Sequence, residues 1–190
     1  MPLDTAPVVP PGTVGSTEQP VLQAGGLLLR AWTEADADAI VAAFADPAIR
    51  RWHARTVDTR AEAAEMIAGY NRAWRAGRSA HWAIAGPRVI GRVALRTIDA
   101  AEGLAEVAYW IAAAERGRGA AVQAAAAVSE WALNVLGLHR LELAHSVLNT
   151  ASCRVAQKAG FAFEGTKRSA CLHADGWHDM HLHARIRGDT

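Results

Sequence analysis

A short glycine-containing segment has the residue types and position of an anion-binding turn. Residues 115–121 read Glu-Arg-Gly-Arg-Gly-Ala-Ala, between an apolar segment at 107–111 and an alanine-rich run at 122–136. The first N–H groups of a helix have no partner within the helix, and the helix dipole is positive at that end. Glycine lets a ligand approach this backbone closely. The segment is predicted to bind phosphate or pyrophosphate, with Arg116 and Arg118 adding positive charge; a tight turn with solvated arginines is the simpler alternative.

A carboxylate interrupts the apolar segment that precedes this turn. Glu106 lies within residues 104–112, whose other side chains are apolar apart from the phenol of Tyr109. Burying a carboxylate is costly unless it is paired or solvated by a cleft, and such groups are candidates for proton transfer. Glu106 is therefore a candidate for proton transfer, with a solvent-face or edge glutamate as the alternative. Strand alternation places Tyr109 on the opposite face, which favours a core position over an acid role.

Two further groups of side chains are candidates for the acceptor side. Residues 48–58 interleave basic and aromatic side chains, and Arg50, Arg51 and Trp52 are predicted to line a substrate entrance. A solvated helical turn with Trp52 in the core is the alternative. His145 is isolated in an apolar segment; a structural role is favoured, with an acid–base role near neutral pH as the alternative.

Histidines and aspartates are concentrated near the C-terminus. The group comprises His173, His178, His181, His183, Asp175 and Asp179. His181 and His183 alternate onto one face of a predicted strand. Histidine and carboxylate can bind zinc, but side chains spaced in this way are more often surface or core residues. No metal site is predicted.

Composition indicates one ordinary globular domain. The 190 residues are 51% hydrophobic and 21% charged, with a formal net charge of +1, so no overall charge favours nucleic acid or an anionic membrane. There is no signal-peptide pattern and no apolar run of about 18–20 residues. Cys153 and Cys171 are accordingly expected to be reduced thiols in a cytoplasmic protein.

Hydrophobic periodicity and capping signals predict the elements that must position these groups. Residues 1–24 contain five prolines and are predicted to be a flexible tail before a domain at 25–190; a lid or partner-binding arm is the alternative. The mixed order favours an α+β fold with a mostly antiparallel sheet. Strands are expected at about 27–32, 81–85, 89–95, 104–112, 138–147, 161–172 and 177–186, and helices at about 33–45, 59–77, 122–136 and 150–159.

Three segments together resemble the GNAT N-acetyltransferases, in particular the RimJ/RimL-like branch. Arg116-x-x-Gly119-x-Ala121 is similar to their acetyl-CoA-binding motif, and the run 136–142 is a second match. The third match is 149–165, with an Asn-x-x-Ser helix cap and a Lys-x-Gly-Phe sequence before the next strand. The segments occur in the family's order and spacing, and the resemblance covers about residues 27–187. Three positions depart from the family pattern, which weakens inference about the substrate: Ala120, Gln123 and Gln157.

The resemblance implies a fold, an activity and a site. The fold would be a single GNAT-like domain, its sheet flanked by about four helices. The activity would be direct transfer, in a ternary complex, of acetyl from acetyl-CoA to a primary amine of a protein N-terminus or small molecule. Glu106 would be the general base, Ser152 the proton donor to sulfur, and Asn149 a pantetheine contact; helix capping is the alternative for Asn149 and Ser152. The implied donor-binding residues are Val107, Tyr109, Trp110, Ile111, Arg116, Gly117, Arg118, Gly119, Ala120, Ala121, Asn149 and Ser152.

The family requires no metal, and homodimers are common in it. Two other functions fit the same motifs. One is an acyl-CoA sensor without catalysis, and the other is an aminoacyl transferase with charged tRNA as donor, which the near-zero net charge disfavours. The acceptor amine stays open at this point, because the turn at 116–121 concerns only the donor.

Overall fold

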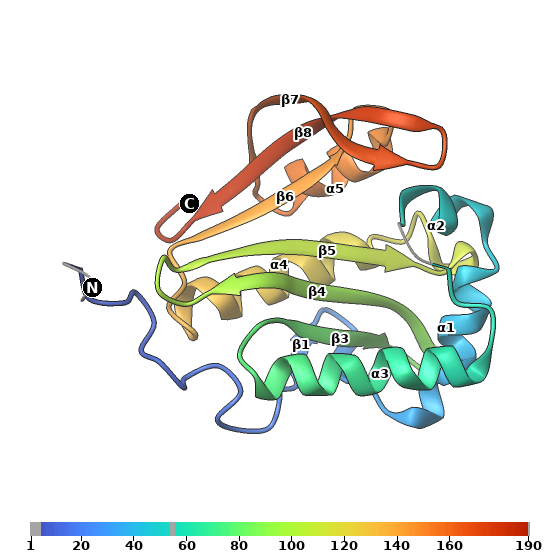
Figure 1. The fold of residues 1–190 in the computed structure, drawn as a ribbon, viewed down its shortest axis with the longest axis horizontal. Coiled ribbons are helices and arrows are strands. Elements are labelled where there is room, and N and C mark those ends of the chain that lie inside the picture. Colours follow the sequence, from blue (N-terminus) through green and yellow to red (C-terminus); the bar gives the residue numbers. More distant parts are fainter. Residues whose placement is uncertain (1–4, 54–55, 190) are drawn as a thin grey trace.

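A mixed, mostly antiparallel sheet organises the fold in the computed structural model, which describes residues 5–53 and 56–189 (Figure 1). All neighbouring strands are antiparallel except β5 and β6, which are parallel. This confirms the predicted fold class. In sheet order the eight strands are β1 (Leu22–Ala24), β2 (Leu27–Ala31), β3 (Ala80–Ala85), β4 (Val89–Asp99), β5 (Leu104–Ile111), β6 (Arg140–Ser146), β8 (Gly176–Ile186) and β7 (Ala162–His173).

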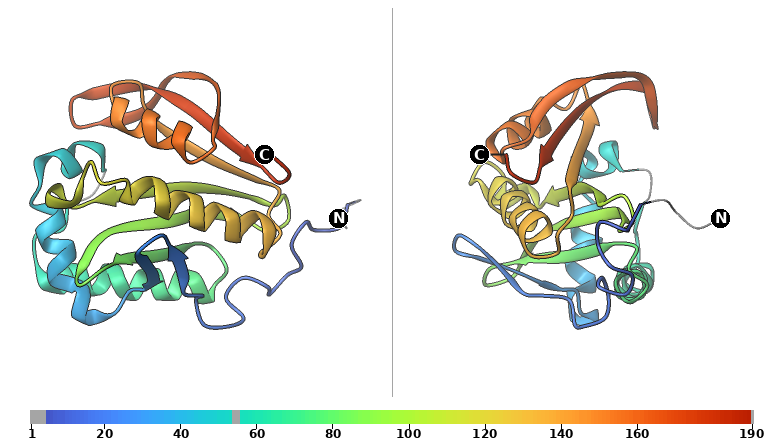
Figure 2. Two further views of the ribbon diagram at one scale, coloured as in Figure 1. Left: turned by 180° about the vertical axis from the view of Figure 1, so that it is seen from behind. Right: turned by 90° about the vertical axis from the view of Figure 1, so that its left-hand side faces the viewer.

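Helices cover both faces of the sheet, as the two views in Figure 2 show. The α-helices are α1 (Ala37–Phe44), α2 (Pro47–Trp52), α3 (Arg60–Arg75), α4 (Ala120–Asn134) and α5 (Thr150–Lys158), with short 3₁₀ turns η1 (Glu34–Asp36) and η2 (Ala113–Glu115). Helices α1 and α3 pack on one face and α4 on the other, with α5 beside α4. The four predicted helices are present, and α2 is the addition. No helix within the described part of the chain is long and apolar enough to cross a membrane.

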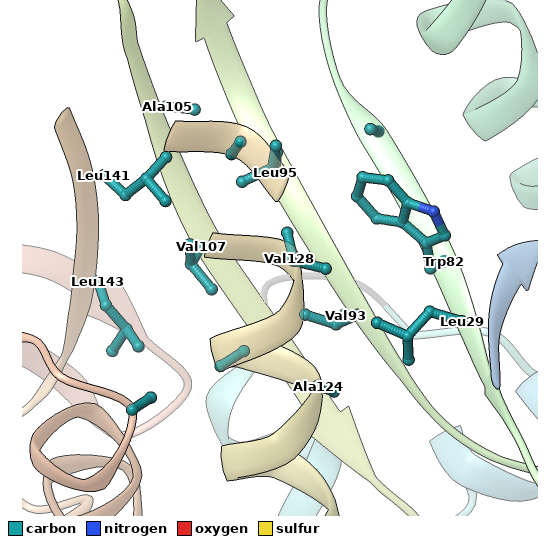
Figure 3. Packing of buried hydrophobic residues seen from close by; sticks show 14 of the residues in the cluster. Leu29, Trp82, Val93, Leu95, Ala105, Val107, Ala124, Val128, Leu141 and Leu143 are labelled. Carbon is teal, nitrogen blue, oxygen red and sulfur yellow. The ribbon is translucent and has the colours of Figure 1, made fainter. Parts of the chain in front are cut away.

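The main core lies between α4 and the sheet (Figure 3). Ala124 and Val128 of α4 face Val93, Val107 and other strand side chains, and all of these are almost fully buried. Alanine is small and favours helix, so an alanine-rich helix can approach the sheet closely without losing propensity. This packing fixes the N-terminal end of α4 at the end of β5, where the glycine turn lies.

The segment before residue 25 lies against the domain where the structure describes it. Val9 is 1% exposed, and its N–H donates to the Ala100 carbonyl at 2.9 Å. The indole N–H of Trp82 donates to the Pro20 carbonyl at 2.7 Å, and β1 adds an edge strand to the sheet. These contacts differ from the free tail expected for residues 1–24, of which 1–4 lie outside the described residues. The prolines are consistent with the lack of helix or strand in the described residues before Leu22, yet Val9 and Val14 are buried against the domain.

His81 on β3 makes the stability of the fold depend on pH. Its ring stacks on Tyr70 with the centroids 4.0 Å apart. Burial, aided by the positive charges of Arg92 and Arg96, lowers the pKa of His81 to about 3. A histidine in the unfolded chain binds its proton near pH 6.5. The stability contributed by neutral His81 is therefore fully present above about pH 6.5 and is lost as the pH falls toward 3.

We expect His81→Phe to reduce this pH dependence while keeping the stacked ring. Protonation of His81 in the unfolded chain should cost the wild type about 2 kcal/mol of unfolding free energy between about pH 7 and pH 5. The variant lacks this contribution, so its loss over the same range should be smaller by that amount. Urea unfolding at both pH values measures the difference. The exposed His139 supplies the control, since His139→Gln should retain the wild-type loss. Equal losses in wild type and His81→Phe would contradict the assignment.

Candidate active site

The turn at residues 116–121 presents free backbone N–H groups at the start of α4. Gly117 and Gly119 have φ values of 78° and 82°, which favour glycine, and Gly119 is the N-cap of α4. Because Gly119 has no side chain, the first N–H groups of α4 receive no side-chain cap. A Cβ built on Gly117 would meet nothing within 4 Å, so the space beside this backbone is open. The turn can therefore accept an anionic ligand.

The two arginines of this turn are paired within the protein. Arg116 donates from Nε to the Ile111 carbonyl at 3.0 Å and forms an ion pair with Asp46, the N-cap of α2. Arg118 forms an ion pair with Glu115 at 3.0 Å. Much of the positive charge expected at the turn is thus compensated locally. Arg116 ties α2 to the turn, and the backbone N–H groups are left as its main anion-binding feature.

Strands β5 and β6 separate beside this turn, as Figure 1 shows. They pair only between residues 104–106 and 140–142, and then diverge. A cleft of about 450 Å³ extends from the turn past the end of β5, bounded by α2 on one side and α5 on the other. Beyond this pairing, the edges that β5 and β6 turn toward each other have main-chain groups free for a ligand, as a pantetheine arm would require. The cleft therefore has the parts that a CoA thioester needs: the anion-binding turn, the gap between β5 and β6, and α5 beside it.

Tyr109 and Ser152 bring two hydroxyls together in the cleft. The Tyr109 hydroxyl lies 2.6 Å from Ser152 Oγ, within hydrogen-bond distance, and both residues line the cleft. Burial raises the pKa of Tyr109 to about 12. Alternation correctly placed Tyr109 on the face opposite Glu106, but that face meets α5 and the cleft as well as the core. The pair was missed because its partners are 43 residues apart in sequence.

Asn149 is the N-cap of α5, which is the simpler alternative that the sequence predicted for it. Its Oδ1 accepts a hydrogen bond from the Ser152 N–H at 3.1 Å. Asn149 also lines the cleft, so its side-chain NH₂ group is available to a ligand. Capping and ligand contact are therefore compatible, because they use opposite ends of the amide.

Glu106 lies outside the cleft that Ser152 lines. Its carboxylate accepts from Arg96 on β4 at 2.6 Å, and the residue pairs across the sheet with Glu142. By alternation it shares a face with Trp110, which does line the cleft. Four residues of strand separate the two, about 13 Å along β5. Val107 lies on the other face, in the core beneath α4.

Of the residues predicted to line an entrance, only Trp52 reaches the cleft. Arg50 forms an ion pair with Asp58. Arg51 lies 3.4 Å from Asp175 and stacks over Trp52, with 4.7 Å from its Cζ to the ring centroid. His145 is buried on β6 outside the cleft, where its ring contacts His181 and His183 of β8.

Two basic residues of the cleft were not singled out from the sequence. Arg154 and Lys158 line it from α5, and neither forms a salt bridge within the described residues. Their i, i+4 spacing places them on one helix face, together with Ala151 and Val155. Because the Asn-x-x-Ser cap predicts a helix here, the i, i+4 spacing could have indicated that both side chains lie on the same side of the cleft and make it positively charged.

A hydrogen-bonded array also lies beside Trp52. Ser146 Oγ is 2.9 Å from His178 Nδ1, and His178 Nε2 is 2.9 Å from a carboxylate oxygen of Asp175. The His178 ring meets the edge of Trp52 at a centroid distance of 6.2 Å. His178 is thus an oriented imidazole next to an aromatic residue of the cleft.

Comparisons with known proteins agree with this geometry. The family model for the acetyltransferase (GNAT) domain matches residues 26–162. The chain is 25% identical over 172 residues to the uncharacterized N-acetyltransferase YoaA of Bacillus subtilis, covering 88% of this chain and 97% of that one. It is 31% identical over 98 residues to a ribosomal-protein-serine acetyltransferase of Escherichia coli, covering 52% of this chain and 55% of that one.

A solved structure shows the same architecture. It is RimL, a ribosomal L7/L12 alpha-N-protein acetyltransferase in complex with coenzyme A, which matches with a TM-score of 0.81 at 20% identity over 90% of this chain and all of that one. The family match extends over the strand β5, the glycine turn and α5, which together form the cleft described above. The chain therefore belongs to the GNAT acetyltransferase family and is an N-acetyltransferase that uses acetyl-CoA.

Proposed function

We propose that this enzyme transfers acetyl directly from acetyl-CoA to the α-amine of a protein or peptide N-terminus, with both substrates bound together. One observation carries the proposal: a single cleft joins the free N–H groups of the α4 turn to the Tyr109–Ser152 hydroxyl pair and to α2. Two relatives that are named for protein acceptors support the choice of a protein, and the name of one of them, an alpha-N-protein acetyltransferase, supports the choice of an α-amine.

The donor would be bound mainly by backbone groups. The N–H groups at 119–121 would hold the pyrophosphate, because they begin a helix and lack internal partners. Arg154 and Lys158 would add charge for the remaining phosphate. The pantetheine arm would lie where β5 and β6 diverge, beside the side-chain amide of Asn149.

The chemistry needs a nucleophilic amine and a proton for the leaving sulfur. The neutral amine nitrogen attacks the thioester carbonyl carbon, a C–N bond forms, and the C–S bond breaks with its electron pair going to sulfur. Ser152 would give its proton to the sulfur and recover one from Tyr109, and Tyr109 would then take a proton from solvent, which restores both hydroxyls. A second residue, acting as a base, would accept the proton that the amine loses.

Two residues could receive the amine proton, and they make different predictions. Glu106 would act through water, given its distance along β5. His178 is the competing base, since it borders Trp52 and is oriented by Ser146 and Asp175. We expect Glu106→Gln to lower kcat at least about 10-fold with acetyl-CoA affinity unchanged, in the range of general-base effects. The parallel variant His178→Gln should have the smaller effect; the reverse order would assign the base to His178.

The acceptor is tested by comparing peptides that differ only in their free amines. We expect mass spectrometry to show acetyl on the N-terminal residue of peptides with a free α-amine. Matched peptides with a blocked N-terminus and a free lysine should stay unmodified. Transfer to lysine or to small polyamines at comparable rates would contradict the choice of an α-amine, without affecting the acetyltransferase activity itself.

A further inference from the structure

We propose that His145, Cys153, His181 and His183 form a zinc-binding site separate from the acetyl-transfer cleft. One ligand atom from each residue lies within 4.8 Å of those of the other three. The four residues come from three elements: β6, α5 and β8. His145 and His181 are cross-strand neighbours, as are Leu143 and His183. The cluster thus joins the antiparallel neighbours β6 and β8 to the helix that follows β6.

The spacing of the nitrogen and sulfur atoms fits tetrahedral zinc. His145 Nε2 lies 3.2 Å from His183 Nε2, and Cys153 Sγ lies 4.0 Å from the same His183 nitrogen. With zinc bonds of about 2.0–2.1 Å to nitrogen and 2.3 Å to sulfur, tetrahedral ligands lie about 3.3 Å apart for N–N and about 3.6 Å for N–S. The His145–His183 separation is close to the tetrahedral value, the Cys153 side chain must move slightly inward toward His183, and all four ligand atoms already lie within 4.8 Å of one another.

The His145 ring is held in an orientation that suits a metal ligand. His145 Nδ1 lies 2.8 Å from the Ser146 carbonyl, so it donates there and leaves the Nε2 lone pair directed at His183. A backbone carbonyl on the second ring nitrogen is a usual support for metal-bound histidine. His183 is 0% exposed, and Phe163 covers His181 and His183 with ring centroids 5.0 and 5.4 Å away.

Two of the four ligands, His181 and His183, belong to the C-terminal histidine group, for which no metal was predicted, whereas His145 and Cys153 come from outside it. His178 is engaged with Ser146 and Asp175, and His173 lies beside it. The ligand set forms only when β6 and α5 bring His145 and Cys153 to His181 and His183. Three imidazoles and one thiolate favour Zn²⁺ over hard, oxygen-binding cations such as Mg²⁺. Four protein ligands would close the site, so its role would be structural.

The site would fix the start of α5 against the sheet. Cys153 directly follows Ser152, so a metal bound at Cys153 would restrain the helix that carries the proposed proton donor. Binding converts the Cys153 thiol to a thiolate and releases its proton to solvent. The alternative for these residues is an imidazole–imidazole hydrogen bond between His145 and His183 without metal.

The test uses the full chain purified without a polyhistidine tag and stripped of metal with a chelator. Titration with Zn²⁺ against a chromophoric chelator should show one ion bound per chain with a submicromolar Kd, and the melting temperature should rise with zinc. Co²⁺ should produce a thiolate-to-cobalt charge-transfer band and the intense visible bands of tetrahedral cobalt. Absence of stoichiometric Zn²⁺ binding would overturn the proposal.

Two pairs of variants locate the site. Cys153→Ser should lose the cobalt–thiolate band and weaken zinc binding at least about 100-fold, whereas Cys171→Ser, the other free cysteine, should behave as wild type. His181→Gln and His173→Gln form the second pair, and only the first should weaken binding. Circular dichroism confirms that each variant is folded, and His181→Gln decides the matter if Cys153→Ser does not fold. Equal zinc affinity within either pair would contradict the assignment.

Discussion

Gly119→Val should weaken acetyl-CoA binding at least about 100-fold, a loss of about 2.7 kcal/mol. Gly119 is the N-cap of α4 at φ 82°. A β-branched side chain is strained in this conformation and would occupy the side of the turn from which a pyrophosphate approaches. Isothermal titration of the variant with acetyl-CoA measures the effect.

Gly12→Val is the matched control for that substitution. Gly12 has φ 81°, and a Cβ built on it would meet nothing within 4 Å, but it lies in the N-terminal segment away from the cleft. Both variants should lose stability through the same strain, about 1–2 kcal/mol, and only Gly119→Val should lose binding.

Ala121→Glu separates stability from binding in the same turn. A carboxylate in the first turn of α4 stabilises the helix through its dipole, yet it repels a bound pyrophosphate. We expect an unchanged or raised melting temperature together with weaker acetyl-CoA binding. Binding as in wild type would contradict the placement of the pyrophosphate.

Ser152→Ala should lower kcat about 100-fold or more while leaving the KM for acetyl-CoA nearly unchanged, because a proton donor acts in the transition state. Tyr109→Phe should lower kcat similarly. Since the two hydroxyls are 2.6 Å apart and act as one unit, the double variant should be little slower than the slower single one. Steady-state thiol release measures all three.

A buried serine outside the cleft provides the control for this pair. Ser129 on α4 donates to the Ala125 carbonyl at 2.8 Å, so Ser129→Ala should leave kcat unchanged. The pKa of Tyr109, raised to about 12, keeps its phenol protonated up to at least about pH 10. A fall in wild-type kcat below that pH that disappears in Tyr109→Phe would contradict the neutral phenol.

The elements were largely predictable from the sequence because their signals are local. Thr59 and Glu62 form a capping box, a local sequence pattern, at the start of α3, and Asn149 caps α5. The sequence indicated a helical turn at α2 only as an alternative, because six residues are too few to show a helical periodicity. The packing of residues 8–24 against the domain could not be predicted, because it depends on single long-range contacts such as the hydrogen bond from the Trp82 indole to the Pro20 carbonyl.

The candidate site was predictable where its features are local in sequence. The turn at Gly119 and the cap at Asn149 are local features of a helix start, and both were found. Side-chain pairing was not: Arg116 binds Asp46 across 70 residues, and Tyr109 meets Ser152 across 43. The same limit hid the cluster of His145 and Cys153 with the β8 histidines, since tertiary contact alone brings these residues together.

The central claim is direct transfer within one cleft that holds both substrates. Initial rates of CoA release, measured while acetyl-CoA and an α-amine peptide are varied independently, test it most directly. The account predicts intersecting double-reciprocal lines and no acetylated enzyme in the intact-mass spectrum after incubation with acetyl-CoA alone. Parallel lines with a stable acetyl-enzyme, or tight acetyl-CoA binding with no amine-dependent CoA release, would contradict it.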